Sequence, residues 1–221
     1  MGQLDNFIDI LSKKIKKYFK EENTGHNIDH LNRVLKYALY LQKNEGGDEI
    51  VIGISAFIHD VHRIMTAECG EYVSPKDSIN KVKEFIDDLD LTDEQKEHIL
   101  YVVEHHEEYG FGKENVSVKD IESLILQDAD NLDMCGAMGI VRAFKYGFQN
   151  QMKDYDPDIA LYYDKFSESK NDASTIHHIY NKLMRLADNM NTVTAKKLAN
   201  EKKKLLQSFL DNYISEYNSE L

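Results

Sequence analysis

Proline, cysteine and tryptophan are scarce in this sequence of 221 residues, which has two prolines, two cysteines and no tryptophan. No Gly, Pro or Ser-rich linker divides the chain, so we expect one domain with one sizeable core, covering residues 1–221. Cys69 and Cys135 lie far apart and outside any CxxC pattern. This spacing argues against a thiolate zinc site and against a disulfide framework, and it favours a reducing cytoplasm.

Positive charge is also in short supply, because 27 Lys and Arg face 39 Asp and Glu, for a formal net charge of -12. Such a chain would repel a long polyanion, so a nucleic-acid polymer is disfavoured as a partner, whereas a small anionic substrate is compatible with it. No stretch reaches the roughly 18 apolar residues of a membrane span. We therefore expect a cytoplasmic protein without a membrane partner.

Apolar residues recur at three- and four-residue spacing, as in Leu31, Val34, Leu35, Ala38 and Leu41, whereas alternation typical of strands is missing. The pattern predicts an all-α fold, a helical bundle of eight to ten helices. Turn residues such as Gly46-Gly47-Asp48 mark helix boundaries. Thr92, with Gln95 three residues later, predicts a capping box, and Thr192–Tyr217 predicts one long C-terminal helix.

Eight of the nine histidines fall into four close groups, which are His26/His30, His59/His62, His105/His106 and His177/His178. Imidazole combined with carboxylate suits a divalent ion such as Mn, Fe, Co or Ni better than a structural zinc, and Mg remains open. In Phe57-Ile58-His59-Asp60-Val61 the pair closes an apolar run. A buried aspartate there needs a partner, and coordination of a metal would satisfy both side chains.

Two further segments extend this pattern. His30 opens an amphipathic helix, and Asp130 lies in the apolar stretch Leu126-Gln127-Asp128-Ala129-Asp130-Asn131. The order along the chain is H, then HD, then D. In this order of motifs, from about Gly25 to about Lys197, the sequence resembles the HD-domain metal-dependent phosphohydrolase superfamily.

Within that superfamily the chain is similar to the small bacterial single-domain branch, which has stretches like QDADNLDMCGAMGIVRAF and STIHHIYNKL and includes nucleotide pyrophosphohydrolases. The resemblance implies an HD-type helical domain with a metal-binding core at about 25–147 and C-terminal helices at about 174–217. It also implies that the metal ligands are His30, His59, Asp60 and Asp130. His26 competes with His30, and Asp128 with Asp130, for the same roles.

Arg63 stands where many members of the family have a lysine, three residues after Asp60. A cation there would clamp a phosphoryl oxygen, which would give Arg63 a catalytic role beside Asp60; the alternative is a surface arginine at a helix end. His62 departs from the small residue common at that position; it is either a surface histidine or a residue that narrows the pocket. Further candidates for substrate binding are His26, Arg33, His178 and Lys182.

His105 and His106 resemble the pair that holds a second metal in dinuclear branches of the superfamily. They are candidates for a second metal or for phosphate contacts, although, apart from His62 beside the HD pair, the chain offers only His98 as a further histidine between Asp60 and this pair. Adjacent helical residues point about 100° apart, so one of the two is expected to face inward and the other outward.

Together the residues and the resemblance predict a metal-dependent phosphohydrolase that acts on a small phosphorylated substrate, with a nucleotide favoured. Asp60 would orient the attacking water or receive its proton. The alternatives are a diiron HD-type oxygenase and a non-catalytic nucleotide-sensing module. For the oligomeric state, a monomer and a homodimer remain open.

Overall fold

The computed structural model describes residues 2–16, 27–108, 120–161 and 173–220. Within these residues the secondary structure is helical throughout and contains no strand, so the predicted all-α class is confirmed. The chain divides into two compact units, residues 1–130 and 131–221, and the division falls inside helix α7 (Ile121–Met134). The sequence predicts a single domain over residues 1–221, with a metal-binding core at about 25–147 and C-terminal helices at about 174–217. This domain organisation stays a prediction.

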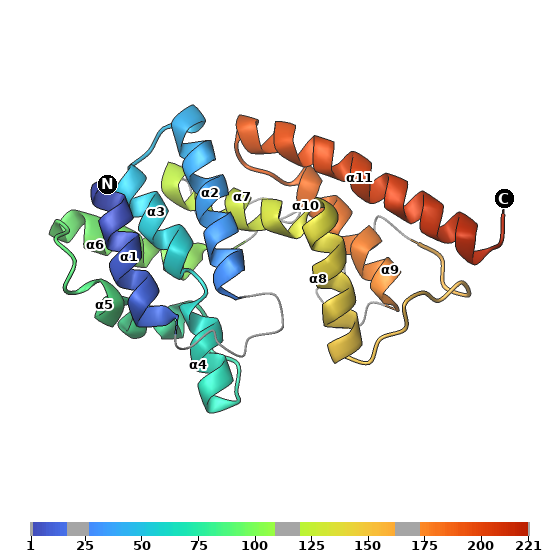
Figure 1. Cartoon of the computed structure of the whole chain (residues 1–221), viewed down its shortest axis with the longest axis horizontal. Helices are drawn as coiled ribbons and strands as arrows, with labels where there is room; N and C mark the ends of the chain where they lie inside the picture. Colours follow the sequence, from blue (N-terminus) through green and yellow to red (C-terminus); the bar gives the residue numbers. More distant parts are fainter. Residues whose placement is uncertain (1, 17–26, 109–119, 162–172, 221) are drawn as a thin grey trace. The chain divides into compact units, whose positions relative to one another are not determined.

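The first unit contains the helices up to the greater part of α7 (Figure 1). They are α1 (Gln3–Ile15), α2 (Ile28–Glu45), α3 (Glu49–Ile58), α4 (Val61–Cys69), the 3-10 turn η1 (Lys76–Ser78), α5 (Ile79–Ile86) and α6 (Asp93–His105).

Helix α3 is the centre of this unit, because it packs against α1, α2 and α6. Its sequence is apolar on every face, and all residues from Val51 to Ile58 are buried. A helix with this composition is stable only when neighbours surround it. At Gly53 a Cβ would lie 2.6 Å from Leu4 Cδ2, so the glycine is what lets α1 approach α3 this closely.

The turn between α2 and α3 is built from the predicted Gly46-Gly47-Asp48 segment. Gly46 and Gly47 have φ of 92° and 93°, which L-residues with side chains rarely adopt. Asp48 then caps α3 by accepting hydrogen bonds from the backbone of Ile50 and Val51 at 2.8 and 3.1 Å. The capping box of Thr92 and Gln95 at the start of α6 is likewise confirmed.

The second unit contains α8 (Gly136–Gln149), α9 (Thr175–His178), the π-helical turn η2 (Ile179–Leu183), α10 (Met184–Asp188) and α11 (Val193–Tyr217). Helix α11 packs against α8, η2 and α10 over a core that includes Ile176, Ile179, Leu206 and Leu210. The long C-terminal helix predicted from Thr192 to Tyr217 is observed from Val193 to Tyr217, and Thr192 caps it by accepting a hydrogen bond from the backbone of Ala195.

One stretch of the described residues, Glu49–Cys69, has the length and the apolar composition of a membrane-spanning helix. Of its most apolar window, 72% is buried inside the protein. The stretch covers α3, α4 and the turn between them, so burial in the core of the first unit accounts for its composition. Cytoplasmic location stays a prediction.

Candidate metal centre

The His59-Asp60 pair forms the turn between α3 and α4, at the end of the buried central helix. His59 is fully buried, and the exposed fraction of Asp60 is 2%. The His59 Nδ1 lies 3.0 Å from the carbonyl oxygen of Ala56. A carbonyl only accepts, so a neutral His59 ring carries its proton on Nδ1 and presents a lone pair on Nε2.

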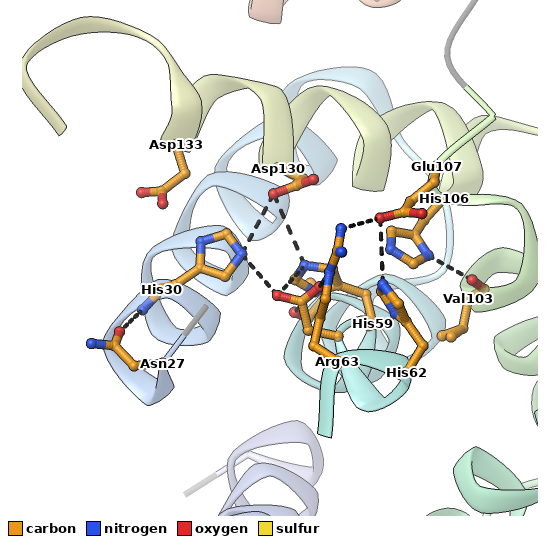
Figure 2. Close-up of polar contacts among 12 residues, drawn as sticks. Asn27, His30, His59, His62, Arg63, Val103, His106, Glu107, Asp130 and Asp133 are labelled. Atoms are coloured by element: carbon orange, nitrogen blue, oxygen red, sulfur yellow. Dashed lines mark hydrogen bonds and ion pairs between the residues drawn. The ribbon is translucent and has the colours of Figure 1, made fainter. Parts of the chain in front are cut away.

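Two helices bring the other two predicted ligands to this turn (Figure 2). His30 lies in the first turn of α2, where its backbone N–H donates to the side chain of Asn27, and Asp130 comes from α7. The His30 Nε2 is 3.3 Å from Asp60 Oδ2 and 3.5 Å from Asp130 Oδ1. The His59 Nε2 is 3.6 and 4.0 Å from the same two oxygens. Two imidazole edges and two carboxylates thus face one point.

Electrostatics at this point fit a divalent cation. Burial lowers the pKa of His59 and outweighs the opposing effect of the Asp60 and Asp130 carboxylates, so the imidazole is neutral near pH 7. Its Nε2 is buried and makes no hydrogen bond within the described part of the chain. A lone pair that faces two carboxylate oxygens is repelled by them, and an ion coordinated by all three groups would turn that repulsion into attraction.

A second group of donors adjoins the first and shares Asp60 with it. Asp60, His62 and His106 each offer one donor atom, and these atoms lie within 4.8 Å of one another. His62 is fully buried, which excludes a surface position for it, and the exposed fraction of His106 is 1%. The two ring centroids are 5.3 Å apart, and the ring of His106 also lies 5.1 Å from that of His59.

Glu107 and Arg63 close one side of this second group (Figure 2). The Arg63 Nη2 donates to Glu107 Oε1 at 2.5 Å, and Arg63 Nε is 3.8 Å from Asp60 Oδ1. The His62 Nε2 is 3.4 Å from the same Glu107 oxygen. Burial raises the pKa of Glu107, but the contacts with His62 and Arg63 outweigh it and lower this pKa to about 2. Glu107 is therefore a carboxylate at neutral pH and holds the Arg63 guanidinium beside Asp60.

His105 and His106 divide as expected for neighbours on a helix. His106 faces the second group of donors, whereas His105 bonds through Nδ1 to the carbonyl of Tyr101 at 2.8 Å and packs on the Tyr101 ring. The His105 Nε2 lies 3.9 Å from Glu108, so this residue is not brought to the cluster. Its predicted role in a second site has no support from the geometry.

The remaining candidates belong to α2, to the second unit, or to residues outside the described ones. Arg33 is partly buried on α2, one turn after His30. His178 and Lys182 belong to the second unit, where His178 stacks on Tyr146 with ring centroids 5.4 Å apart and Lys182 lies in η2. Their roles in substrate binding stay predictions. His26, the competitor of His30, lies outside the described residues.

His177 has a structural role in the second unit. Its Nδ1 is 2.7 Å from the hydroxyl of Ser174, and its Nε2 is 3.0 Å from the carbonyl of Ile159. Because a carbonyl accepts, Nε2 carries the proton and Nδ1 accepts from Ser174. The ring therefore ties the segment after α8 to the start of α9.

One residue of the site, Glu107, was not identified from the sequence, and for His62 the choice between a surface position and a place in the pocket was left open. For His62 a signal existed, because it stands only two residues after the His59-Asp60 pair that closes the apolar run. For Glu107 none did, since a Glu beside two histidines in a charged segment is ordinary surface composition.

Comparison with known proteins places this site in a family. Residues 27–135 match the HD domain family. A solved protein of Lactobacillus plantarum superposes with a TM-score of 0.77 at 28% identity, covering 98% of this chain and 99% of that one. An HD-superfamily hydrolase of Bacillus thuringiensis superposes with a TM-score of 0.74 at 27% identity, covering 99% and 100%. The YpgQ protein of Bacillus subtilis is 27% identical over 196 residues, 89% of this chain and 86% of YpgQ.

Residues 27–135 are therefore an HD domain, and they contain His30, His59, Asp60 and Asp130 together with the second group of donors. The chain is similar along almost its whole length to an HD-superfamily hydrolase. The resemblance seen in the order of the H, HD and D motifs is confirmed.

Proposed function

We propose that this protein is a metal-dependent phosphohydrolase that cleaves a phosphoanhydride or phosphoester bond in a small phosphorylated molecule, with a nucleotide as the favoured substrate. The observation that carries the proposal is the convergence of His30, His59, Asp60 and Asp130. Two imidazole nitrogens lie 3.3–4.0 Å from two carboxylate oxygens in a buried cluster.

In this proposal His30, His59, Asp60 and Asp130 hold one divalent ion, with Mn, Fe, Co or Ni favoured over structural zinc and with Mg also to be tested. Such an ion supplies a lowered pKa for a bound water and polarises a phosphoryl oxygen. The hydrogen bond from His59 Nδ1 to Ala56 fixes the ring so that Nε2 points at the ligand position.

Two side chains take catalytic roles. Asp60 orients the attacking water and accepts its proton, because its carboxylate is nearly buried and faces the same point as the two histidines. Arg63 neutralises phosphate charge as the bond breaks, since its guanidinium is held 3.8 Å from Asp60 and about a third of its side chain remains exposed, at 35%. Glu107 positions that guanidinium.

One observation favours a nucleotide over other small phosphorylated molecules, and a second is compatible with a nucleotide but not with a nucleic-acid polymer. The YpgQ protein of Bacillus subtilis has been solved in complex with ADP, and its fold matches this chain with a TM-score of 0.73. The net charge of -12 disfavours a nucleic-acid polymer but not a mononucleotide, whose few charges meet the ion and Arg63 locally.

The test is a screen of nucleoside mono-, di- and triphosphates with metal-depleted protein, to which Mn²⁺, Co²⁺, Ni²⁺ or Mg²⁺ is added. Pyrophosphate and orthophosphate are scored separately, so the bond that is cleaved is identified. We expect turnover with at least one metal, and a loss of 10²-fold or more, on the order of what removal of a catalytic group costs, in Asp60→Ala. Hydrolysis that needs no metal, or that survives in Asp60→Ala, would contradict the proposal.

A diiron HD-type oxygenase is the second candidate, and the observation that favours it is the second group of donors at Asp60, His62 and His106. An oxygenase needs two full metal sites. Oxygen uptake by the protein loaded with Fe²⁺, measured with an oxygen electrode and without phosphate release from any nucleotide, would support this candidate over the hydrolase.

A further inference from the structure

We propose that His98, Asp120 and Glu122 form a binding site for a divalent transition-metal ion that shares no residue with the HD centre and joins helix α6 to the start of α7. His98 is the histidine that falls outside the four close groups of the sequence. It lies on α6, whereas Asp120 immediately precedes α7 and Glu122 lies in the first turn of that helix. All three residues belong to the first unit.

The three side chains present their donor atoms to one another. The His98 Nε2 is 3.2 Å from Asp120 Oδ1 and 3.7 Å from Glu122 Oε2. One donor atom from each residue lies within 4.8 Å of the other two, a spacing that an ion with ligand bonds of roughly 2.0–2.2 Å can bridge after small side-chain shifts. Zn²⁺ accepts imidazole and carboxylate ligands, and in open sites it takes three ligands from the protein and a fourth from water.

An unsatisfied carboxylate oxygen is the first argument for an ion at this place. Asp120 Oδ1 accepts a hydrogen bond from the backbone N–H of Ser123 at 2.9 Å and thereby caps α7. Its other oxygen, Oδ2, is buried and makes no hydrogen bond to a described residue. A buried carboxylate oxygen without a donor costs free energy, and a cation bound by this carboxylate would compensate for that cost.

The burial of Glu122 is the second argument. The exposed fraction of its side chain is 10%, although glutamate is rarely buried without a counter-charge. Its Oε1 accepts a hydrogen bond from the backbone N–H of Asp48 at 2.9 Å, and a Cβ at Gly47 would lie 3.1 Å from this oxygen, so the glycine leaves room for the carboxylate. Among the described residues, the contact with His98 is the one that remains for Oε2.

Negative charge at this group lacks a balancing side chain. Two carboxylates face one imidazole, and no lysine or arginine in the described part of the chain forms an ion pair with either of them. The alternative occupant is a proton on His98, which would place an imidazolium beside the two carboxylates. A metal ion binds the same Nε2 lone pair that this proton takes, so the two occupants exclude each other.

The experiment is the stoichiometry of Zn²⁺ bound to the full chain, measured by equilibrium dialysis and elemental analysis over a range of free Zn²⁺. Two substitutions remove a ligand charge and keep the structural contacts, because an asparagine in Asp120→Asn still caps α7 and the amide oxygen in Glu122→Gln still accepts from Asp48. We expect each of them, and His98→Gln, to lose one ion relative to the wild type or to bind it about tenfold or more weakly.

His105→Gln is the matched control, because His105 lies on the same helix about two turns further on and is bonded to Tyr101. It should bind as many ions as the wild type. Circular dichroism confirms that each variant is folded.

A second series separates this site from the HD centre. In the Asp60→Ala background, His98→Gln should again remove one ion, because the two sites share no residue. Zn²⁺ should also slow amide hydrogen exchange at Asp48 and Ser123, whose N–H groups are held by the two ligating carboxylates. This slowing, measured by nuclear magnetic resonance, should be absent in His98→Gln.

The outcomes distinguish this site from other zinc binding. Equal numbers of ions in the wild type and in all three ligand variants overturn the site and leave the hydrolase proposal intact, since Asp60 takes no part in it. Loss of an ion in His98→Gln but not in Asp120→Asn or Glu122→Gln also overturns the site, because the histidine then binds zinc without the carboxylates. If Asp60→Ala alone abolishes the ion that His98→Gln removes, the ion belongs to the HD centre and the inference is wrong.

Discussion

Burial of His106 makes the free energy of unfolding of the metal-depleted protein depend on pH. Burial, followed by the neighbouring His59, lowers the pKa of His106 from 6.5 to about 4, against a weaker opposing effect of Glu107. Between these two values the unfolded chain binds a proton that the folded chain does not. Acidification therefore favours the unfolded chain, and this contribution to stability is lost as the pH falls from 6.5 to 4.

The magnitude follows from the pKa difference. One pKa unit corresponds to about 1.4 kcal/mol, so His106 accounts for about 3 kcal/mol between neutral pH and pH 4, and for about 2 kcal/mol between pH 7 and pH 5. Burial also lowers the pKa of His59, which adds to the dependence in the same direction. Comparison with a variant is therefore needed to isolate His106.

The assay is urea unfolding followed by circular dichroism at pH 7 and pH 5, in the presence of a chelator. From pH 7 to pH 5 the wild type should lose about 2 kcal/mol more stability than His106→Gln. His105→Gln is the control, because His105 is part-exposed and bonded to Tyr101, and it should keep the wild-type dependence. An equal pH dependence in the wild type and His106→Gln would refute the assignment of His106 as a buried neutral imidazole.

Three further predictions concern the carboxylates and the arginine of the site. Free Mn²⁺ at 100 times its dissociation constant should stabilise the wild type by about 2.7 kcal/mol. The resulting rise in melting temperature should vanish in Asp130→Ala and persist in Asp128→Asn. The reverse result would make Asp128 the ligand. Arg63→Ala should lower kcat for the substrate found in the screen about 10²- to 10³-fold, with part of the rate restored in Arg63→Lys, and an unchanged kcat would remove Arg63 from the mechanism. Because the pKa of Glu107 is lowered from 4.5 to about 2, its charged form contributes up to about 3 kcal/mol to stability above pH 4.5, and this contribution is lost as the pH falls to 2. In urea unfolding, Glu107→Gln should lack this part of the acid dependence. If the variant keeps the wild-type dependence, Glu107 is not held in its charged form.

The fold class and the burial of the candidate ligand pair His59-Asp60 were predictable because both depend on local pattern. Apolar spacing, Gly46-Gly47-Asp48 and the Thr92 capping box act within a few residues of one another, and the structure has the expected helix boundaries there. The His59-Asp60 pair at the end of an apolar run signals a buried polar group, which needs a partner whatever the tertiary arrangement.

The partners of His62 and Arg63 could not be predicted, because they depend on how α4 and the end of α6 meet. Glu107 is 44 residues from Arg63 in the chain, and their ion pair has no short-range signal. The same limit applied to His105 and His106: the sequence indicates that they face different ways, but only packing within the first unit decides which one faces inward.

Three histidines of the centre share one local device that links sequence to chemistry. His59, His62 and His106 each bond through Nδ1 to the carbonyl three residues earlier in the chain. This bond needs no distant partner, so a neutral ring in this position has its proton on Nδ1 and its lone pair on Nε2. His59 and His62 lie on either side of Asp60 in one turn, and both histidines offer a donor atom within 4.8 Å of one from the Asp60 carboxylate. The short HDVH sequence from His59 to His62 thus places a carboxylate beside two imidazoles, and the rest of the fold has only to bring His30, Asp130 and His106 to this turn.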